Sequence, residues 1–338
     1  MRIFSNFSTF SYKKLLLFAN VSKNRNNLKK EILTLIAFFV YSITVMSFDV
    51  CVKAPAKVNI GLKVLKKRAD GFHNIESIFQ TLDFSDELKI TRIPQKECVV
   101  RCAQMRLPLE NTLTKTYSAF CDETKIDFGV EVVLDKALPA GGGLGGGSSD
   151  GASLLKGLSE LSGITLTDSL ADSVAAKVGS DVFFFLHSGF FEKGRGCALV
   201  SGRGEVVEAI EPRTDLSFVL IFPGIHSSTP EAYSLVDEAY ESGFYDSENG
   251  LEFPDFSELK RFYYGLIGAW KFTNSFTPVL TNKYPLIGEA IRDILGCGAD
   301  WADMSGSGAT VFGVFGSELA ARRAVLECQK KWKCVLAK

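Results

Sequence analysis

Apolar and polar residues alternate along the first regular segment of the chain. Every second position from 58 to 64 is Val, Ile or Leu, whereas Lys57 and Asn59 occupy positions between them. A period of two is typical of a strand with one buried face, so Lys57 and Asn59 are expected to share the other face. On this pattern alone, that face is solvated.

Apolar spacing predicts further elements on both sides of a break at residues 212–215. Before it, strands are expected over 87–93, 129–138 and 182–186, and helices over 112–121, 150–161 and 166–178. After it, strands are expected over 216–222 and 310–315, and helices over 230–240, 284–295 and 317–331. The break predicts two domains, residues 46–212 and 213–338, with α+β layering rather than a doubly wound sheet.

A glycine-rich run joins the strand over 129–138 to the helix over 150–161. Its residues are Pro139, Ala140, Gly141, Gly142, Gly143, Leu144, Gly145, Gly146, Gly147, Ser148 and Ser149. So many glycines cost backbone entropy, which indicates a ligand lying close to the backbone. The helix start offers unpaired N–H groups and a positive dipole end, and Ser148 and Ser149 are expected at the N-cap. The run therefore predicts a phosphate site rather than a flexible linker.

Other nucleotide-binding motifs are absent or weak. The chain has no Gly-x-x-x-x-Gly-Lys-Ser/Thr and no His-Arg-Asp or Asp-Phe-Gly. Gly141-x-Gly143-x-x-Gly146, with Asp168 downstream, satisfies the dinucleotide fingerprint, but a run this rich in glycine matches it by chance. An NAD-dependent dehydrogenase is therefore a weak alternative.

Composition narrows the class of protein. A net charge of -1 over 338 residues argues against a nucleic-acid partner. The eight cysteines include no Cys-x-x-Cys pair and the three histidines are scattered, so neither a zinc site nor a histidine-built metal site is expected. The cysteines are expected to be reduced, mostly buried thiols in a cytoplasmic protein.

Residues 1–45 form a separate segment. Basic residues precede an apolar run over 32–45, as in a signal peptide, but no small-x-small cleavage site follows. The run is shorter than the roughly 20 residues of a membrane-spanning helix. We expect an over-extended start, with Met46 as the initiator, in preference to a membrane tether. No stable membrane association is expected.

Three segments resemble motifs of the GHMP kinases, the superfamily of galacto-, homoserine, mevalonate and phosphomevalonate kinases. They are the run over 139–149, Ala54-Pro55-Ala56-Lys57-Val58-Asn59-Ile60-Gly61-Leu62, and Met304-Ser305-Gly306-Ser307-Gly308-Ala309. The resemblance implies an N-terminal domain like ribosomal protein S5 domain 2, with a left-handed crossover, and a ferredoxin-like C-terminal domain.

A further segment, Arg68-Ala69-Asp70-Gly71-Phe72-His73, resembles one subfamily. Its members use ATP to phosphorylate the 2-hydroxyl of 4-diphosphocytidyl-2-C-methyl-D-erythritol in non-mevalonate isoprenoid precursor biosynthesis. This segment argues against a mevalonate-type or homoserine kinase. The presence of both Lys57 and Asp181 argues against an inactive nucleotide-binding module.

The resemblance also implies the catalytic residues. In the family, residues matching Lys57 and Asp181 orient and deprotonate the acceptor hydroxyl. Asp181 precedes the apolar residues 182–186, and Lys57 is its expected partner because an isolated buried charge is disfavoured. For a loose phosphoryl-transfer transition state, positioning is expected to matter more than proton abstraction.

The expected substrate contacts follow from the same resemblance. Residues matching Phe72 and Tyr233 stack on the two sides of the cytosine, and the backbone of His73 is expected to bind that base. The remaining expected substrate-binding residues are Asn59, Thr229, Ser305 and Gly306, with Ser305 and Gly306 closing over the phosphates. Mg²⁺ is expected to bridge the ATP phosphates, with Ser148 or Ser149 as candidate hydroxyl ligands. The sequence does not decide between these two serines.

Overall fold

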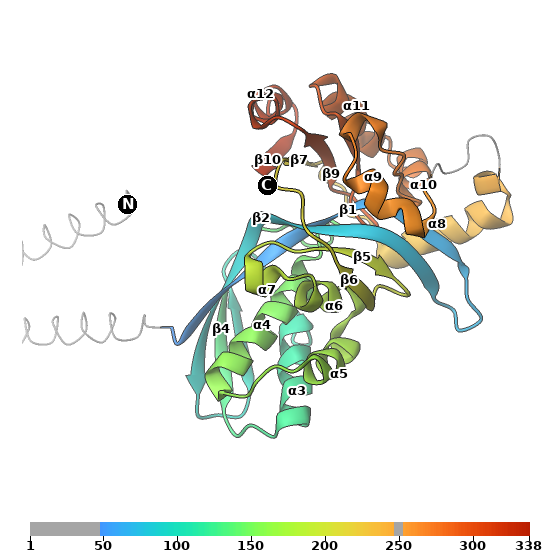
Figure 1. The fold of residues 1–338 in the computed structure, drawn as a ribbon. Helices are drawn as coiled ribbons and strands as arrows, with labels where there is room; N and C mark the ends of the chain where they lie inside the picture. The colour runs from blue at the N-terminus through green and yellow to red at the C-terminus, as the bar shows by residue number, and fades with distance from the viewer. Residues whose placement is uncertain (1–47, 247–252) are drawn as a thin grey trace, which may run out of the picture. The chain divides into compact units, whose positions relative to one another are not determined.

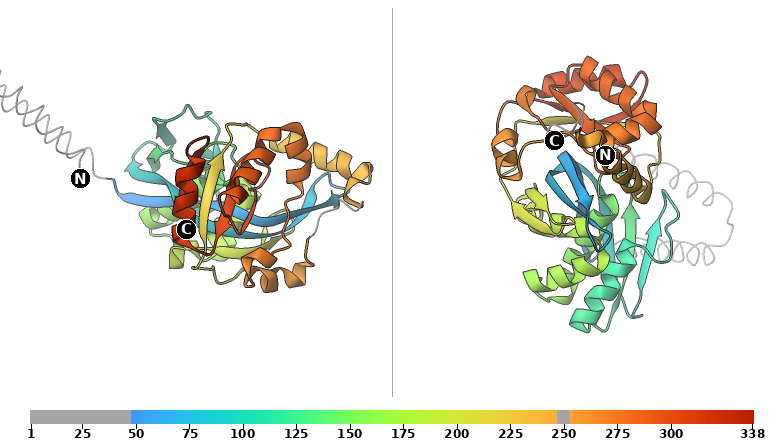
Figure 2. Two further views of the ribbon diagram at one scale, coloured as in Figure 1. Left: turned by 90° about the horizontal axis from the view of Figure 1, so that it is seen from above. Right: turned by 90° about the vertical axis from the view of Figure 1, so that its right-hand side faces the viewer.

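The computed structural model describes residues 48–246 and 253–338. Asp49–Lys338 form one compact unit, in which two sheets lie between two groups of helices (Figures 1 and 2). The predictions for residues 1–45 and for a start at Met46 fall outside the described residues. None of the helices in the described ranges is long and apolar enough to cross a membrane.

The first sheet contains the alternating segment and the strand before the glycines. In the described residues it has six strands: β1 Val50–Lys67, β2 His73–Ile93, β3 Cys98–Cys102, β4 Gly129–Asp135, β5 Cys197–Ser201 and β6 Val206–Ala209. Their order is β3-β4-β2-β5-β6, and β1 pairs with β2. The pairing of β3 with β4 is parallel and the others are antiparallel, so β1 and β2 form the long hairpin at the centre of Figure 1.

Helices cover the lower face of this sheet in Figure 1. They are α3 Thr112–Thr124, α4 Gly146–Ser162, α5 Asp168–Val178, α6 Ser180–His187 and α7 Phe190–Lys193. Leu154, Leu155 and Leu158 of α4 are buried in one apolar cluster with residues of β2 and β4. This packing fixes the start of α4, at the end of the glycine run, against the sheet.

The second sheet is antiparallel, with the order β10-β7-β9-β8. Its strands are β7 Ser217–Phe222, β8 Trp301–Met304, β9 Val311–Phe315 and β10 Lys333–Ala337. The helices of this region are α8 Thr229–Glu241, α9 Leu259–Tyr263, α10 Phe276–Lys283, α11 Pro285–Gly296 and α12 Glu318–Cys328, with short 3₁₀ turns η1 Phe244–Asp246, η2 Phe256–Glu258 and η3 Ile267–Ala269. A strand order of 4-1-3-2 is that of a ferredoxin-like sheet, and the change of sheet falls between β6 and β7. The predicted α+β layering is confirmed.

One predicted element is wrong. Residues 182–186, expected as a strand, belong to helix α6. A short apolar run does not distinguish a buried strand from a buried helix, and α6 is apolar on several sides because it packs against α4, α5 and β6. Gly179 ends α5 at this point, as expected, and the chain starts α6 at the next residue.

The alternation in β1 does not mark a solvated face. Lys57 and Asn59 are only 3% and 1% exposed, because helix α6 and the glycine run cover the face that carries them. The expectation of mostly buried thiols is also wrong. All eight cysteines are free, but Cys197 and Cys328 alone are fully buried.

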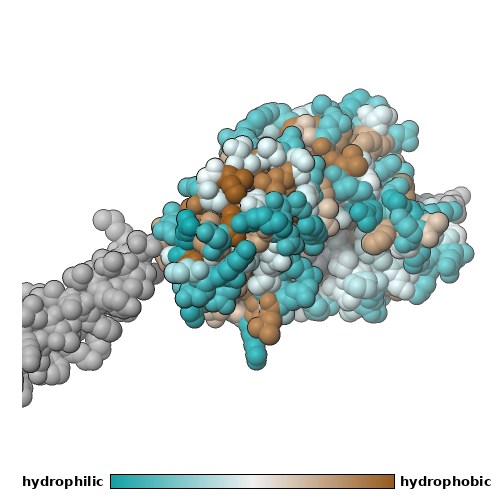
Figure 3. Space-filling model, turned by 90° about the horizontal axis from the view of Figure 1, so that it is seen from below, coloured by the Kyte–Doolittle hydropathy of each residue, from teal (hydrophilic) through white to brown (hydrophobic). Residues whose placement is uncertain are grey.

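The surface seen from below in Figure 3 is hydrophilic over most of its area, with hydrophobic residues in smaller groups. The more exposed large apolar side chains include Leu109, Leu266 and Leu326, which lie far apart in the sequence.

Candidate active site

The glycine loop, residues 139–145, connects β4 to α4 and is bound to two other segments, β1 and the connection between β8 and β9. Leu144 accepts a hydrogen bond from the Lys57 N–H of β1 (2.9 Å), and Gly142 accepts one from the Thr310 N–H (3.2 Å). The carbonyl of Gly143 accepts the Ser305 hydroxyl (2.9 Å). Hydrogen bonds from residues far apart in the sequence therefore fix the backbone conformation of the glycine loop.

Helix α4 begins at Gly146, and its N-cap is Gly145 with φ +69°. The expectation that Ser148 and Ser149 supply the N-cap is therefore wrong. The left-handed conformation at the cap favours glycine over serine and brings the backbone N–H groups of 146–148 to the loop. Ser148 lines the adjoining pocket, whereas Ser149 is fully buried and its hydroxyl has no hydrogen-bond partner in the described residues.

Gly143 is the loop position least able to accept a side chain. Its φ is +76°, and a methyl group there would overlap the carbonyl oxygen of Ser305. We expect Gly143→Ala to lower the melting temperature, because left-handed backbone alone costs about 1–2 kcal/mol for a residue with Cβ. Gly147→Ala is the matched control, since its Cβ would lie 3.5 Å from Thr112 Oγ1, an ordinary contact. Equal melting temperatures for the two variants would contradict the predicted clash.

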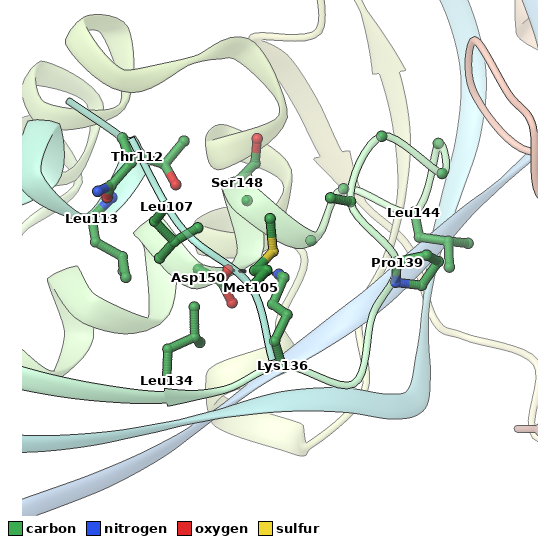
Figure 4. A pocket seen from close by; sticks show the side chains of 18 residues that line it. Met105, Leu107, Thr112, Leu113, Leu134, Lys136, Pro139, Leu144, Ser148 and Asp150 are labelled. Carbon is green, nitrogen blue, oxygen red and sulfur yellow. Dashed lines mark hydrogen bonds and ion pairs between the residues drawn. The ribbon is translucent and has the colours of Figure 1, made fainter. Parts of the chain in front are cut away.

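A pocket of about 330 Å³ opens beside the glycine loop (Figure 4). Its apolar wall comes from Met105, Leu107, Leu113 and Leu134, and the loop backbone forms the other side. Lys136 and Asp150 lie between these two parts and form an ion pair (Nζ to Oδ2, 2.8 Å). The pocket thus combines an apolar wall with a helix N-terminus, a feature that generally favours anions.

Lys57 and Asp181 meet beside this loop. Lys57 Nζ lies 3.5 Å from Asp181 Oδ2 and donates a hydrogen bond to Asn59 Oδ1 (2.7 Å). It also lies 4.6 Å from the centre of the Phe79 ring, which favours a cation. The Lys57 side chain is 4% exposed and that of Asp181 is 33% exposed, so the carboxylate is the member of the pair that a substrate can reach.

The turn over residues 305–308, between β8 and β9, closes the loop from the second sheet. Ser305 donates to Gly143, and its hydroxyl lies 3.4 Å from Asn59 Oδ1. Asn274, fully buried, donates from Nδ2 to the carbonyls of Met304 and Gly306. Burial raises the pKa of Asp303 to about 6, and this carboxyl accepts the Asn274 N–H (2.8 Å). The turn is therefore fixed by a buried network.

Tyr233 of α8 lies near Asp181 and also contacts His73, the first residue of β2. The rings of His73 and Tyr233 lie 5.0 Å apart, and Tyr233 also contacts Phe276. Burial raises the pKa of Tyr233 to about 12, and the charge of Asp181 adds to the shift. Phe72 is 54% exposed, with the Arg203 guanidinium 5.0 Å from its ring centre. Thr229 Oγ1 lies 2.9 Å from Ser307 Oγ.

Comparison with known proteins gives the family. Residues 111–189 match the GHMP kinases N terminal domain, and residues 256–334 match the GHMP kinases C terminal. A 4-diphosphocytidyl-2-C-methyl-D-erythritol kinase of Treponema pallidum (strain Nichols) is 39% identical over 283 residues, which cover 83% of this chain and 94% of that protein. The chain belongs to this family of GHMP kinases. A relative of the same name from Thermotoga maritima is 39% identical over 265 residues, 77% of this chain and 90% of that protein.

Solved structures agree with this GHMP kinase assignment. A crystal structure of 4-(cytidine 5'-diphospho)-2C-methyl-D-erythritol kinase has a TM-score of 0.67 and 27% identity, and the match covers 85% of this chain and 98% of that chain. Homoserine kinase from Cytophaga hutchinsonii has a TM-score of 0.62 at 19% identity, over 86% of this chain and 94% of that chain, which shows the fold alone. The expected two-domain GHMP kinase fold is confirmed.

Within this GHMP kinase, the structure brings most of the expected site residues together. Lys57, Asn59, Asp181, Ser305 and the glycine loop are joined by direct contacts. Phe72 and Tyr233 make no ring contact with each other in the described residues, and His73 is the ring that Tyr233 contacts. Ser149 does not line the pocket.

Sequence reasoning missed several residues of the site. Lys136 and Asp150 flank the glycine run, and a charged residue at each end of a phosphate loop was a usable signal. Asn274 and Phe79 gave no such signal. Asn274 reaches the 305–308 turn across about thirty residues of sequence, and Phe79 is one of several buried residues of the long strand β2.

Proposed function

We propose that this protein transfers the γ-phosphoryl group of ATP to the 2-hydroxyl of 4-diphosphocytidyl-2-C-methyl-D-erythritol. The observation that carries the proposal is the Lys57–Asp181 pair, 3.5 Å apart, at the edge of the glycine loop. The Lys57 backbone N–H donates a hydrogen bond to the Leu144 carbonyl of that loop. This bond fixes the position of Lys57 relative to the proposed phosphate site. The names and identities of the relatives supply the acceptor.

In this proposal the glycine loop and the first N–H groups of α4 bind the ATP phosphates. Oriented N–H groups and the positive end of the helix dipole stabilise negative charge. Ser305 and Gly306 face the same loop from the second sheet, and they contact the transferring phosphoryl group. The division into residues 46–212 and 213–338 then assigns the ATP site mainly to the first domain.

Asp181 accepts the proton of the acceptor hydroxyl. It also orients the oxygen of that hydroxyl toward the γ-phosphorus. Lys57 holds this carboxylate and offsets negative charge near the transferring group. Asn59 and Phe79 fix the ammonium group from two sides, so it stays in place before the substrate binds. In a loose phosphoryl-transfer transition state, this alignment and charge neutralisation contribute most of the rate.

Mg²⁺ fits the donor groups beside the loop. It takes oxygen ligands and is usually held by one or two protein groups together with substrate phosphates. Ser148 is the hydroxyl at the helix start that lines the pocket, and no group of three or more His, Cys, Asp or Glu suited to a metal occurs in residues 48–246 and 253–338. We therefore assign Ser148, rather than Ser149, as a protein ligand. When bound, the ion neutralises charge on the phosphates.

The cytidine is proposed to bind between Phe72 and Tyr233, with the backbone of His73 and the Thr229 hydroxyl beside it. His73 is fixed for this role, because Nδ1 lies 2.7 Å from the Leu65 carbonyl and Nε2 lies 3.2 Å from Asp237 Oδ1. Phe72 is exposed on the β1–β2 turn and available to a base. This arrangement supports a nucleoside site separate from the ATP pocket.

Alanine at Phe72 or Tyr233 should raise the KM for the acceptor. Stacking contributes about 1–3 kcal/mol per base, which corresponds to about 5- to 150-fold in KM. The KM for ATP should hardly change, and CMP should lose potency as a competitor in both variants. Tyr264→Ala is the control, because Tyr264 is exposed and contacts Tyr263 and Glu211 instead. A weaker affinity for ATP with an unchanged acceptor KM would contradict the cytidine site and assign these rings to ATP binding or to the core.

A coupled ADP-release assay tests the proposed function. The purified protein is given ATP and Mg²⁺ with the cytidine substrate, mevalonate or homoserine in parallel. We expect ADP release that depends on the cytidine substrate, and little release with the other two acceptors. Faster ADP release with mevalonate or homoserine would contradict the proposed acceptor. The assignment to the GHMP kinases would stand.

A further inference from the structure

Asp303 is a buried carboxylate to which the proposed mechanism assigns no role. It lies in β8, two positions before Ser305, and only 5% of its surface is exposed. Burial raises the pKa of Asp303 to about 6, so this group is ionised at neutral pH. A buried charge is unfavourable unless its surroundings compensate it. The contacts of Asp303 therefore show which part of the fold this charge holds.

Three hydrogen-bond donors converge on the Asp303 carboxylate, and all three are neutral. Oδ2 accepts the Asn274 N–H (2.8 Å), and Oδ1 accepts the Met304 N–H (2.7 Å) and the Thr277 hydroxyl. An ionised carboxylate only accepts, whereas a protonated one must place its own hydrogen among these donors. The charged form thus joins the end of β8 to the segment that leads into α10.

Asn274 connects this carboxylate to the 305–308 turn. The Asn274 side chain is fully buried, and its Nδ2 donates to the carbonyls of Met304 and Gly306, both at 2.8 Å. These two carbonyls lie on either side of Ser305, which the proposed function places against the transferring phosphoryl group. By binding the Asn274 N–H, Asp303 fixes the residue that holds this turn.

The residues on either side of Asn274 are bound to β1. The Leu62 N–H donates to the Thr273 carbonyl (2.9 Å), and the Leu62 carbonyl accepts the Ser275 N–H (2.7 Å). The same strand carries Lys57, five residues earlier. This segment therefore connects the strand of the proposed catalytic lysine to the turn that closes over the phosphates.

We propose that Asp303 is a positioning residue, whose carboxylate holds the 305–308 turn in the place relative to β1 that phosphoryl transfer requires. The inference rests on the proposed function, and Asp303 itself touches neither substrate. Transfer is sensitive to such support, because a misplacement of about 1 Å that starts far from the chemistry can cost about 10²-fold in rate. Neutralising Asp303 should release the turn and slow the transfer.

Asp303→Asn tests this role at a pH of about 8, where the parent carboxyl is ionised. The amide keeps the shape of the side chain but has one oxygen acceptor instead of two. We expect turnover to fall about 10- to 100-fold. The affinity for ATP, measured by calorimetry with Mg²⁺, should hardly change, because the glycine loop and the start of α4 bind that nucleotide. A merely structural role would lower the fraction of folded protein but not the turnover of each ATP-binding molecule.

The pH dependence of turnover distinguishes the charge of Asp303 from its shape. Asp303 gains a proton as the pH falls through about 6, and the parent carboxyl then resembles the amide. The ratio of parent to Asp303→Asn turnover should therefore shrink between about pH 8 and about pH 5. Other titratable groups of the site, among them Asp181 and His73, are common to both proteins and cancel in this ratio. A ratio that stays constant over this range would overturn the inference.

Thr277→Val is a milder variant that tests the same carboxylate if Asp303→Asn does not fold. It removes one donor from Asp303 and should lower turnover about 2- to 10-fold, as for one hydrogen bond. Thr281→Val is the matched control, because Thr281 lies on the same helix but donates to the Pro278 carbonyl (3.1 Å). The control should keep the parent turnover. Equal turnover in the two threonine variants would count against the inference.

The outcomes separate this inference from the proposed function. A parent protein that phosphorylates none of the acceptors would contradict the proposed function, and the inference with it. An active parent protein, together with parent-like turnover in folded Asp303→Asn, would overturn the role of Asp303 alone. A loss of ATP affinity as large as the loss of turnover would also overturn it, because the carboxylate would then support the glycine loop rather than the transfer step.

Discussion

Replacement of Asp181 by asparagine should lower turnover by about 10²- to 10⁴-fold, the range for loss of a positioned proton acceptor. The asparagine keeps the shape of the side chain but does not accept the hydroxyl proton. The KM and binding affinity for ATP should stay nearly unchanged, since the glycine loop holds that nucleotide. Single-turnover kinetics and calorimetry with ATP measure the two effects separately.

The control for Asp181→Asn is Asp172→Asn. Asp172 lies on α5 and pairs with the partly exposed His187 at 2.7 Å, away from the glycine loop contacts. Its substitution should leave turnover within a factor of about two, as for surface changes in general. Near-normal turnover in Asp181→Asn would remove this carboxylate from the mechanism.

Replacement of Lys57 by methionine should lower turnover by about 10²- to 10³-fold, as for removal of one preorganised electrostatic group. Methionine is unbranched and fills the buried space left by the lysine stem. The fold should persist, because Asp181 is partly exposed and water can solvate it. Steady-state kinetics and a melting curve check the two parts of this expectation.

Lys63→Met is the matched control for Lys57→Met. Lys63 lies on the same strand, with its side chain 33% exposed and 3.6 Å from Glu76. Its substitution should leave turnover nearly unchanged. The double variant of Lys57 and Asp181 should be little slower than either single variant, because groups that act as a unit are not additive. Fully additive losses would show that the two residues act independently.

The local signals in the sequence were sufficient to predict that the glycine run leads into a helix. A strand, a glycine run and an apolar helix in succession place a ligand at one point, and helix α4 begins within this run. The detail at its start was not predictable, because serine is favoured at N-caps in general while this cap needs the left-handed conformation of Gly145. The spacing alone did not reveal that conformation.

The geometry around Asp181 depended on tertiary packing. The apolar run 182–186 fits a buried strand and a buried helix equally well, and contacts with α4, α5 and β6 determine that it forms α6. The alternation in β1 likewise indicated a solvated face, but helix α6 and the glycine loop cover the face that carries Lys57 and Asn59. Resemblance to a family supplied the pairing of Lys57 with Asp181, which no periodic pattern contains.

The most direct test of the account is to identify the product. The protein is incubated with ATP, Mg²⁺ and 4-diphosphocytidyl-2-C-methyl-D-erythritol, and the mixture is examined by phosphorus NMR and mass spectrometry. The account predicts a new phosphate monoester on the 2-hydroxyl, formed in equal amount with ADP and absent with Asp181→Asn. Formation of ADP without a phosphorylated acceptor, or a phosphate on another hydroxyl, would contradict it.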